Sequence, residues 1–232
     1  LEGQDVDPSE PVPANLHGML TSAVFSASKV RDRFSVDGWL ALNDLAETTE
    51  KMRMTVVAGD DAARAMGILL RKITGFSGLV HENMYRFTGW RFLGIGRSLE
   101  RAMAMANLLA VFTGDDAPEG ALELTLEVGD SSMSMNRRYT VSVSSAPVLD
   151  LLALDTKNPR SILYQLNEMK DHLSVLPGAD RYGQLSELSR AMLEVHTSLS
   201  VSTPETLTPE TLNDLSGRIA SLSLGLSTTY IR

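Results

Sequence analysis

The chain has 232 residues, of which 43% are hydrophobic and 6% aromatic, so it can form a sizeable core built mainly from Leu, Met, Ala and Val. It contains no cysteine, which excludes disulfides, thiolate catalysis and cysteine-ligated metals. The net charge of -8 argues against nucleic acid or an anionic membrane as a partner, and without a run of about 18 apolar residues we expect no membrane-spanning helix.

The N-terminal segment differs in composition from the rest of the chain. Residues 1–15 contain four acidic residues, three prolines and no basic residue, which is typical of a disordered tail or a linker. The segment has no basic region followed by an apolar stretch, so it does not resemble a signal peptide and we expect a cytoplasmic location. We expect residues 16–232 to form one domain.

Apolar side chains recur with the helical period along most of this domain, which predicts an all-α fold. We expect a single multi-helix bundle of roughly eight or nine helices. Predicted helices span residues 16–33, 35–57, 60–85, 90–112, 119–127, 158–176, 181–199 and 209–224. Residues 130–145 alternate like a strand in part but have no second strand nearby, so we predict a helix for much of them.

Three sequence patterns mark helix starts. Ser35, followed by Val36 and Asp37, fits the entry to a helix. Asn158 and Pro159 fit the cap and the first position of a helix. The pentapeptide Thr-Pro-Glu-Thr-Leu occurs at 203–207 and again at 208–212. Each copy places Thr before Pro and Glu, so we predict two successive helix starts rather than a repeat protein.

The helix predicted over 90–112 carries Arg97, Glu100 and Arg101 among apolar neighbours. A buried charge without a partner is very costly, so we expect these charges to be partly buried and paired. Arg97 and Glu100 are spaced to pair along the helix, and the other partners must come from distant segments. The candidate site residues in those segments are Asp130, Arg138, Tyr139, Asn158 and Arg160.

Three interpretations of this cluster remain open. An arginine-rich group with few carboxylates suits binding of a carboxylate, a phosphate or a peptide terminus. The same residues would also serve as an internal salt-bridge network that sets the register of the helices. In a catalytic interpretation Glu100 is the general base, but Arg97 and Arg101 should lower the pKa of its carboxyl group and make it a poor base near neutral pH.

Other short patterns predict structure rather than chemistry. Gly94 and Gly96 lack the third glycine and the preceding strand of a dinucleotide-binding motif, so we expect them to permit close approach of another helix. Glu168 and His172 lie one turn apart, and we expect an exposed pair rather than metal ligands. We expect neither a metal site nor a cofactor.

Several of these stretches, in this order, resemble the alpha-E domain family, a bacterial all-helical domain named for its Glu and Arg motif. They are VRDRFSVDGWLALNDL (30–45), GWRFLGIGRSLERA (89–102), GDSSMSMNRRY (129–139) and LLALDTKNPRSILYQL (151–166), which leads to HLSVLP (172–177). Family members usually begin with an additional Glu-Arg helix upstream. This helix has no counterpart here, so we expect an alpha-E-like domain over 16–232 that lacks the first helix of the family.

The resemblance implies a function as well as a fold. Alpha-E domains occur beside, or fused to, circularly permuted ATP-grasp proteins, in a context of ATP-dependent amide-bond formation on peptides or proteins. We therefore expect a non-catalytic accessory or interaction domain whose partner, in cis or in trans, is such an ATP-grasp protein and whose cluster binds a carboxylate or a peptide. The alternatives are a catalytic domain of the same system that uses Glu100, and a purely structural helical bundle.

Overall fold

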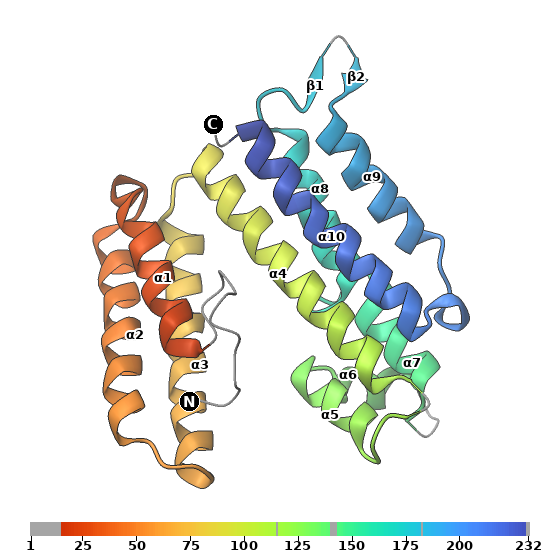
Figure 1. The fold of residues 1–232 in the computed structure, drawn as a ribbon, viewed down its shortest axis with the longest axis horizontal. Helices are drawn as coiled ribbons and strands as arrows, with labels where there is room; N and C mark the ends of the chain where they lie inside the picture. The colour runs from red at the N-terminus through yellow and green to blue at the C-terminus, as the bar shows by residue number, and fades with distance from the viewer. Residues whose placement is uncertain (1–14, 115, 140–142, 182, 231–232) are drawn as a thin grey trace. The chain divides into compact units, whose positions relative to one another are not determined.

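The computed structural model describes residues 15–114, 116–139, 143–181 and 183–230 (Figure 1). These residues form ten α-helices, short 3-10 and π-helical turns and one small hairpin, so the predicted all-α fold is confirmed. The tail or linker predicted at residues 1–15 lies outside the described residues apart from Asn15. No helix in the described part of the chain is both long and apolar enough to cross a membrane.

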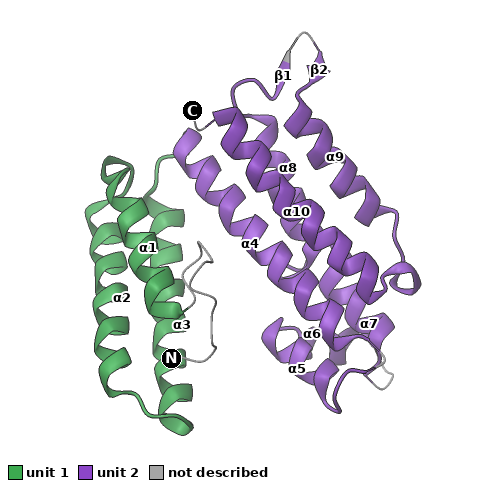
Figure 2. Cartoon of the chain, in the orientation of Figure 1, with its two compact units in different colours: residues 1–86 green, residues 87–232 purple. Residues whose placement is uncertain are grey.

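The helices divide into two compact units, residues 1–86 and 87–232, where the sequence led us to expect one bundle (Figure 2). The division falls between helix α3 (Asp60–Asn83) and helix α4 (Thr88–Phe112). The backbone becomes extended at Met84, with φ of -78° and ψ of 128°, so the helical hydrogen bonding of α3 ends there. Each unit buries apolar side chains of its own.

The first unit contains α1 (Leu16–Ser28) and α2 (Val36–Thr55) in addition to α3. Helix α2 packs against both α1 and α3. Asn15 caps α1 by accepting a hydrogen bond from the backbone N–H of Gly18 at 2.8 Å, and Ser35 caps α2 as the sequence predicts. The buried apolar side chains of this unit are Ala27, Leu42, Leu45, Ala65, Leu69, Val80 and Met84.

The second unit is built on a four-helix bundle of α4, α8 (Ile162–Ser174), α9 (Glu187–Ser200) and α10 (Pro209–Tyr230). Helix α4 packs against α8 and α10, and α9 packs against α8 and α10 on the opposite side of the bundle core. Helices that pack against each other in this bundle are antiparallel (Figure 1). Both copies of the repeated pentapeptide start helices as predicted, because Thr203 precedes a 3-10 turn and Pro209 begins α10.

The chain between α4 and α8 forms a helical cap at one end of this bundle. It contains α5 (Ala121–Val128), α6 (Ser132–Arg138), α7 (Ser145–Leu149) and a π-helical turn, Asp150–Leu154. The cap lies at the end of the bundle where α4 stops and α8 starts (Figure 1). Part of the ambiguous segment is helical as predicted, and its residues 140–142 lie outside the described residues.

Helix α8 starts after Ser161 and not at Asn158. The Ser161 hydroxyl accepts a hydrogen bond from the backbone N–H of Tyr164 at 3.1 Å, which is the capping contact. The Asn158 side chain instead donates to the Leu151 carbonyl and to the Ser131 hydroxyl. The predicted helix start is therefore wrong, because Asn158 has tertiary partners that the local sequence does not reveal.

The helix predicted over 181–199 also starts later, at Glu187. The residues before it form an antiparallel hairpin of β1 (Asp180–Arg181) and β2 (Gln184–Leu185). Gly183 in the turn has φ of 77°, a conformation that glycine adopts without steric cost. This turn chemistry, rather than the apolar period, decides where α9 begins.

Candidate functional site

Three of the four charged residues of α4 lie on the exposed side of the helix. Arg97, Glu100 and Arg101 are exposed, whereas the neighbouring Ile95 and Leu99 are buried in the bundle. Within the described ranges, none of the three charged side chains forms an ion pair or a hydrogen bond. The expectation that these charges are paired is therefore wrong, because α4 buries an apolar face while its charged side chains reach solvent. Of the three, Arg101 is partly buried.

Arg97 and Arg101 of α4 form a cationic group with Arg160, which lies in the loop before α8. We call these three residues the arginine cluster. Helices α4 and α8 pack against each other, with Gly94 against His172 in the last turn of α8. The charge of Arg97 acts on this histidine, and Arg101 interacts with Tyr164 in the first turn of α8. The pKa of Arg101 is lowered by burial and then by the positive charges of Arg97 and Arg160. Three guanidiniums whose positive charges meet at Arg101, without a carboxylate partner in the described part of the chain, form a site suited to an anion.

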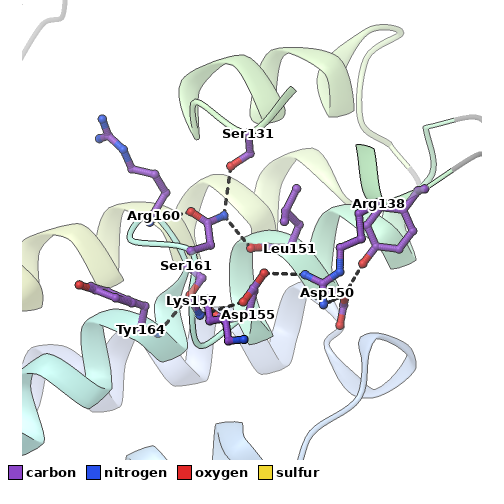
Figure 3. Close-up of polar contacts among 11 residues, drawn as sticks. Ser131, Arg138, Asp150, Leu151, Asp155, Lys157, Arg160, Ser161 and Tyr164 are labelled. Carbon is purple, nitrogen blue, oxygen red and sulfur yellow. Dashed lines mark hydrogen bonds and ion pairs between the residues drawn. The ribbon is translucent and has the colours of Figure 1, made fainter. Parts of the chain in front are cut away.

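Hydrogen bonds of the loop before α8 hold Arg160 in place (Figure 3). The Asn158 side chain accepts from the backbone N–H of Arg160 at 3.0 Å. It also donates to the Leu151 carbonyl at 2.9 Å and to the Ser131 hydroxyl at 3.1 Å, which joins the loop to the helical cap. Figure 3 shows Arg160 and Tyr164 extending to the same side of the loop. Asn158 therefore positions the loop that presents Arg160.

Arg138 and Tyr139 belong to a separate ion-pair network (Figure 3). Arg138 pairs with the carboxylate of Asp155 and lies 3.8 Å from that of Asp150, and the Tyr139 hydroxyl donates to Asp150. Burial, followed by the hydrogen bond and the charge of Asp150, raises the pKa of Tyr139 to about 12. Because two carboxylates already neutralise Arg138, this network resembles a structural clamp more than an open anion site.

The structure thus separates residues that the sequence grouped together. Asp130 links α5 to α6 with φ of 48°, a left-handed conformation that Asp tolerates better than most residues, and its side chain is exposed. The eight predicted residues divide into the arginine cluster of Arg97, Arg101 and Arg160, the ion-pair network of Arg138 and Tyr139, the loop residue Asn158, and the exposed acids Glu100 and Asp130. Sequence reasoning missed Asp150 and Asp155, which have no local pattern that marks them as partners.

His172 is a further residue of the α4–α8 contact that sequence reasoning placed incorrectly. It is 5% exposed, so the predicted exposed pair with Glu168 is wrong. A Cβ atom on Gly94 would lie 2.3 Å from its Nε2, and the Trp90 ring packs edge-on at 4.8 Å. Arg91 donates to Nδ1 at 3.1 Å, because a guanidinium has no acceptor. No group of three or more His, Asp or Glu residues in the described chain has a metal-binding arrangement.

We expect His172 to make the free energy of unfolding fall as the pH drops below about 6.5. Burial, followed by the positive charges of Arg91 and Arg97, lowers the pKa of His172 in the folded chain, so the unfolded chain takes up the proton first. Urea denaturation at about pH 8 and about pH 5.5 measures the effect. The His172→Asn variant should show a smaller loss, and an equal loss would contradict the prediction. Burial and Lys170 lower the pKa of His196 as well, so the difference between parent and variant isolates His172.

The fold and the charged helix together define an all-α domain that presents a Glu-Arg pair on a bundle helix. The chain belongs to the alpha-E family, described as a predicted alpha-helical domain with a conserved ER motif, whose model matches residues 7–231. Glu100 and Arg101 form the only Glu-Arg dipeptide in the sequence. This dipeptide lies in the part of α4 that contributes Arg97 and Arg101 to the arginine cluster.

The chain is similar to two mycobacterial proteins, Uncharacterized protein Rv2567 of Mycobacterium tuberculosis and Uncharacterized protein Mb2597 of Mycobacterium bovis. Each is 30% identical to it over 229 residues. The alignment covers 95% of this chain and 25% of each relative, so the chain spans about a quarter of the length of these relatives. No solved structure matches the chain.

Proposed function

We propose that this domain is a non-catalytic accessory domain that binds a carboxylate, including that of a peptide, through the arginine cluster. In this proposal the domain serves a peptide ligation or protein-modification system, and its partner, on the same chain or on another, is a circularly permuted ATP-grasp protein. The observation that carries the proposal is that the charges of Arg97 and Arg160 act on Arg101, while none of the three forms an ion pair with a carboxylate in the described part of the chain.

The electrostatics of the cluster favour an anion. Arg97 and Arg160 make it harder for Arg101 to hold its charge, and this mutual repulsion is relieved when an anion lies between the guanidiniums. The planar guanidinium matches a carboxylate with two parallel hydrogen bonds, which adds geometric specificity. Tyr164 extends to the same side as Arg160 and supplies a hydroxyl donor next to the cluster.

The two alternative functions have weaker support. A general base is normally held by neighbours that orient its carboxylate, whereas Glu100 is exposed and no described residue bonds to its side chain. A purely structural role for the cluster requires internal pairing, whereas its arginines on α4 are exposed. The closed network around Arg138 fits that structural role better.

The accessory role is supported by the family resemblance and by the length of the relatives. In the two mycobacterial proteins the similar region is about a quarter of a longer chain, so in them it accompanies other segments. The association of alpha-E domains with ATP-grasp proteins supplies the class of partner. A surface that binds a peptide carboxylate would present the end or a side chain of a peptide to such a partner.

We expect Arg101→Ala to weaken binding of a tri-glutamate peptide by about tenfold or more, because a hydrogen bond between two charged groups contributes about 1.5–3 kcal/mol. Titration followed by NMR measures the dissociation constant. Arg190→Ala removes an exposed arginine of α9 and serves as the matched control, with affinity unchanged. Equal affinity of the parent chain and Arg101→Ala would overturn the carboxylate site.

Glu100→Ala separates the proposed function from the purely structural alternative, with peptide titration and urea denaturation as the two measurements. In the proposed function it keeps peptide affinity and changes the free energy of unfolding by less than about 0.5 kcal/mol, as exposed substitutions usually do. A loss of about 3–5 kcal/mol would instead indicate a buried structural network. Co-purification with a circularly permuted ATP-grasp protein from the same source tests the partner, and the absence of both association and any effect on ligation would overturn the accessory role.

A further inference from the structure

A cavity that shares no lining residue with the arginine cluster lies between α8, α9 and the hairpin. Its volume is about 310 Å³, within the range of small-molecule sites. Leu173 and Met192 form an apolar floor and are 3% and 1% exposed. Leu185 and Leu193 also line it, yet each remains 44% exposed. The cavity therefore combines a buried apolar floor with apolar walls that are open to a ligand.

Two opposite charges line the same cavity without pairing. Lys170 and Asp180 are both lining residues, but no ion pair within 4.0 Å joins them. The Lys170 Nζ lies 3.3 Å from Nε2 of His196, and the same Nε2 lies 2.7 Å from Oδ1 of Asn167. The Lys170 ammonium has three N–H donors, so a contact with one ring nitrogen leaves at least two of them for another partner. The ammonium of Lys170 therefore keeps its hydrogen-bonding capacity for a ligand.

The hairpin wall of the cavity is held in place by hydrogen bonds to α9. The carbonyl of Ala179 accepts from the backbone N–H of Ser186 and from the hydroxyl of Ser189, each at 2.9 Å. Ser189 is itself a lining residue, so these bonds fix the position of Asp180 relative to α9. A wall that is already ordered loses little entropy when a ligand binds.

We propose that this cavity binds a free α-amino acid with an apolar side chain, with the ligand carboxylate on Lys170 and the ligand ammonium on Asp180. The apolar side chain of the ligand covers Leu185 and Leu193 and reaches the floor formed by Met192. A zwitterion satisfies both separated charges at once, whereas a peptide terminus offers only one of the two groups. The proposal does not depend on the arginine cluster.

Titration with three related probes tests the site. L-leucine carries both charges, L-leucinamide lacks the carboxylate and N-acetyl-L-leucine lacks the ammonium. We expect the parent chain to bind L-leucine at least about tenfold more tightly than either analogue, because each analogue leaves one charged group of the cavity without a partner. Chemical shifts of the lining residues should move on titration.

Two substitutions should each remove one of these preferences. Lys170→Met should abolish the preference for L-leucine over L-leucinamide and keep the preference over N-acetyl-L-leucine. Asp180→Asn should abolish the preference for L-leucine over N-acetyl-L-leucine and keep the preference over L-leucinamide. Lys157→Met, which removes a lysine from the loop before α8, is the matched control and should bind like the parent chain.

The result that overturns the proposal is equally specific. Equal binding of all three probes, or no shift change at the lining residues in the parent chain, would show that the two charges do not recognise a zwitterion. Lys170→Arg keeps the cation and should retain part of the affinity, so a fold defect in Lys170→Met is distinguishable from loss of the charge. Intact L-leucine binding with no binding of tri-glutamate would leave this site standing while the arginine-cluster proposal fails.

Discussion

Leu152→Ala is expected to lower the free energy of unfolding of the second unit by about 2–5 kcal/mol. Leu152 lies in the π-helical turn before α8 and is 0% exposed, so the substitution leaves a cavity in the helical cap. Leu224→Ala on α10 is the matched control, because the same atoms are removed at a position that is 69% exposed. A similar loss in both variants would contradict the prediction.

Urea denaturation measures this effect, and the two units require separate probes because multi-domain chains depart from two-state unfolding. The chain contains two tryptophans, Trp39 in the first unit and Trp90 in the second. In a Trp39→Phe background the fluorescence of Trp90 follows the second unit alone. The control variant is made in the same background.

Gly129 provides a test of the packing partner of Leu152. A Cβ atom on Gly129 would lie 2.6 Å from Cδ2 of Leu152, so Gly129→Ala should overpack the cap and cost about 1–3 kcal/mol. Leu152→Ala removes the atom that clashes. The cost of Gly129→Ala should therefore shrink in that background, a coupling that two independent sites would not show.

Gly94→Ala is expected to destabilise the second unit by about 1–3 kcal/mol, because its Cβ atom would lie 2.3 Å from Nε2 of the buried His172. Gly96→Ala is the matched control on the same helix, since a Cβ atom there meets nothing within 4 Å. That substitution should stabilise α4 by up to about 1 kcal/mol, because alanine has the higher helix propensity. Thermal and urea unfolding of the two variants measure the difference, and shifts of the same sign would contradict the expected contact.

Gly94 and Gly96 show what the sequence can and cannot predict about a contact between helices. The spacing of Gly94 and Gly96 predicts close approach of another helix, and the structure confirms this for Gly94 only. The pattern cannot distinguish them, because the face of α4 that meets α8 depends on the packing of the whole bundle. His172 completes the contact from 78 residues further along the chain, a separation at which no local period operates.

Helix starts likewise divide into those that local sequence predicts and those that distant partners decide. Ser35 caps α2 and Pro209 begins α10 as the sequence predicts, because capping and the proline ring act within one turn of chain. Asn158 carries an equally good cap signal but bonds to Leu151 and Ser131, and Ser161 takes the capping role. A local signal fails where a distant partner offers the side chain a better contact.

The all-α fold, most of the helices and the family follow from local sequence, because helical period, capping and ordered motifs are properties of neighbouring residues. Which charges act on one another depends on how the helices pack. The packing brings the charges of Arg97 and Arg160 to bear on Arg101, and it pairs Arg138 with Asp150 and Asp155. The electrostatic interaction between two groups depends on the distance between them and on their burial, and for residues on different helices both are set by packing.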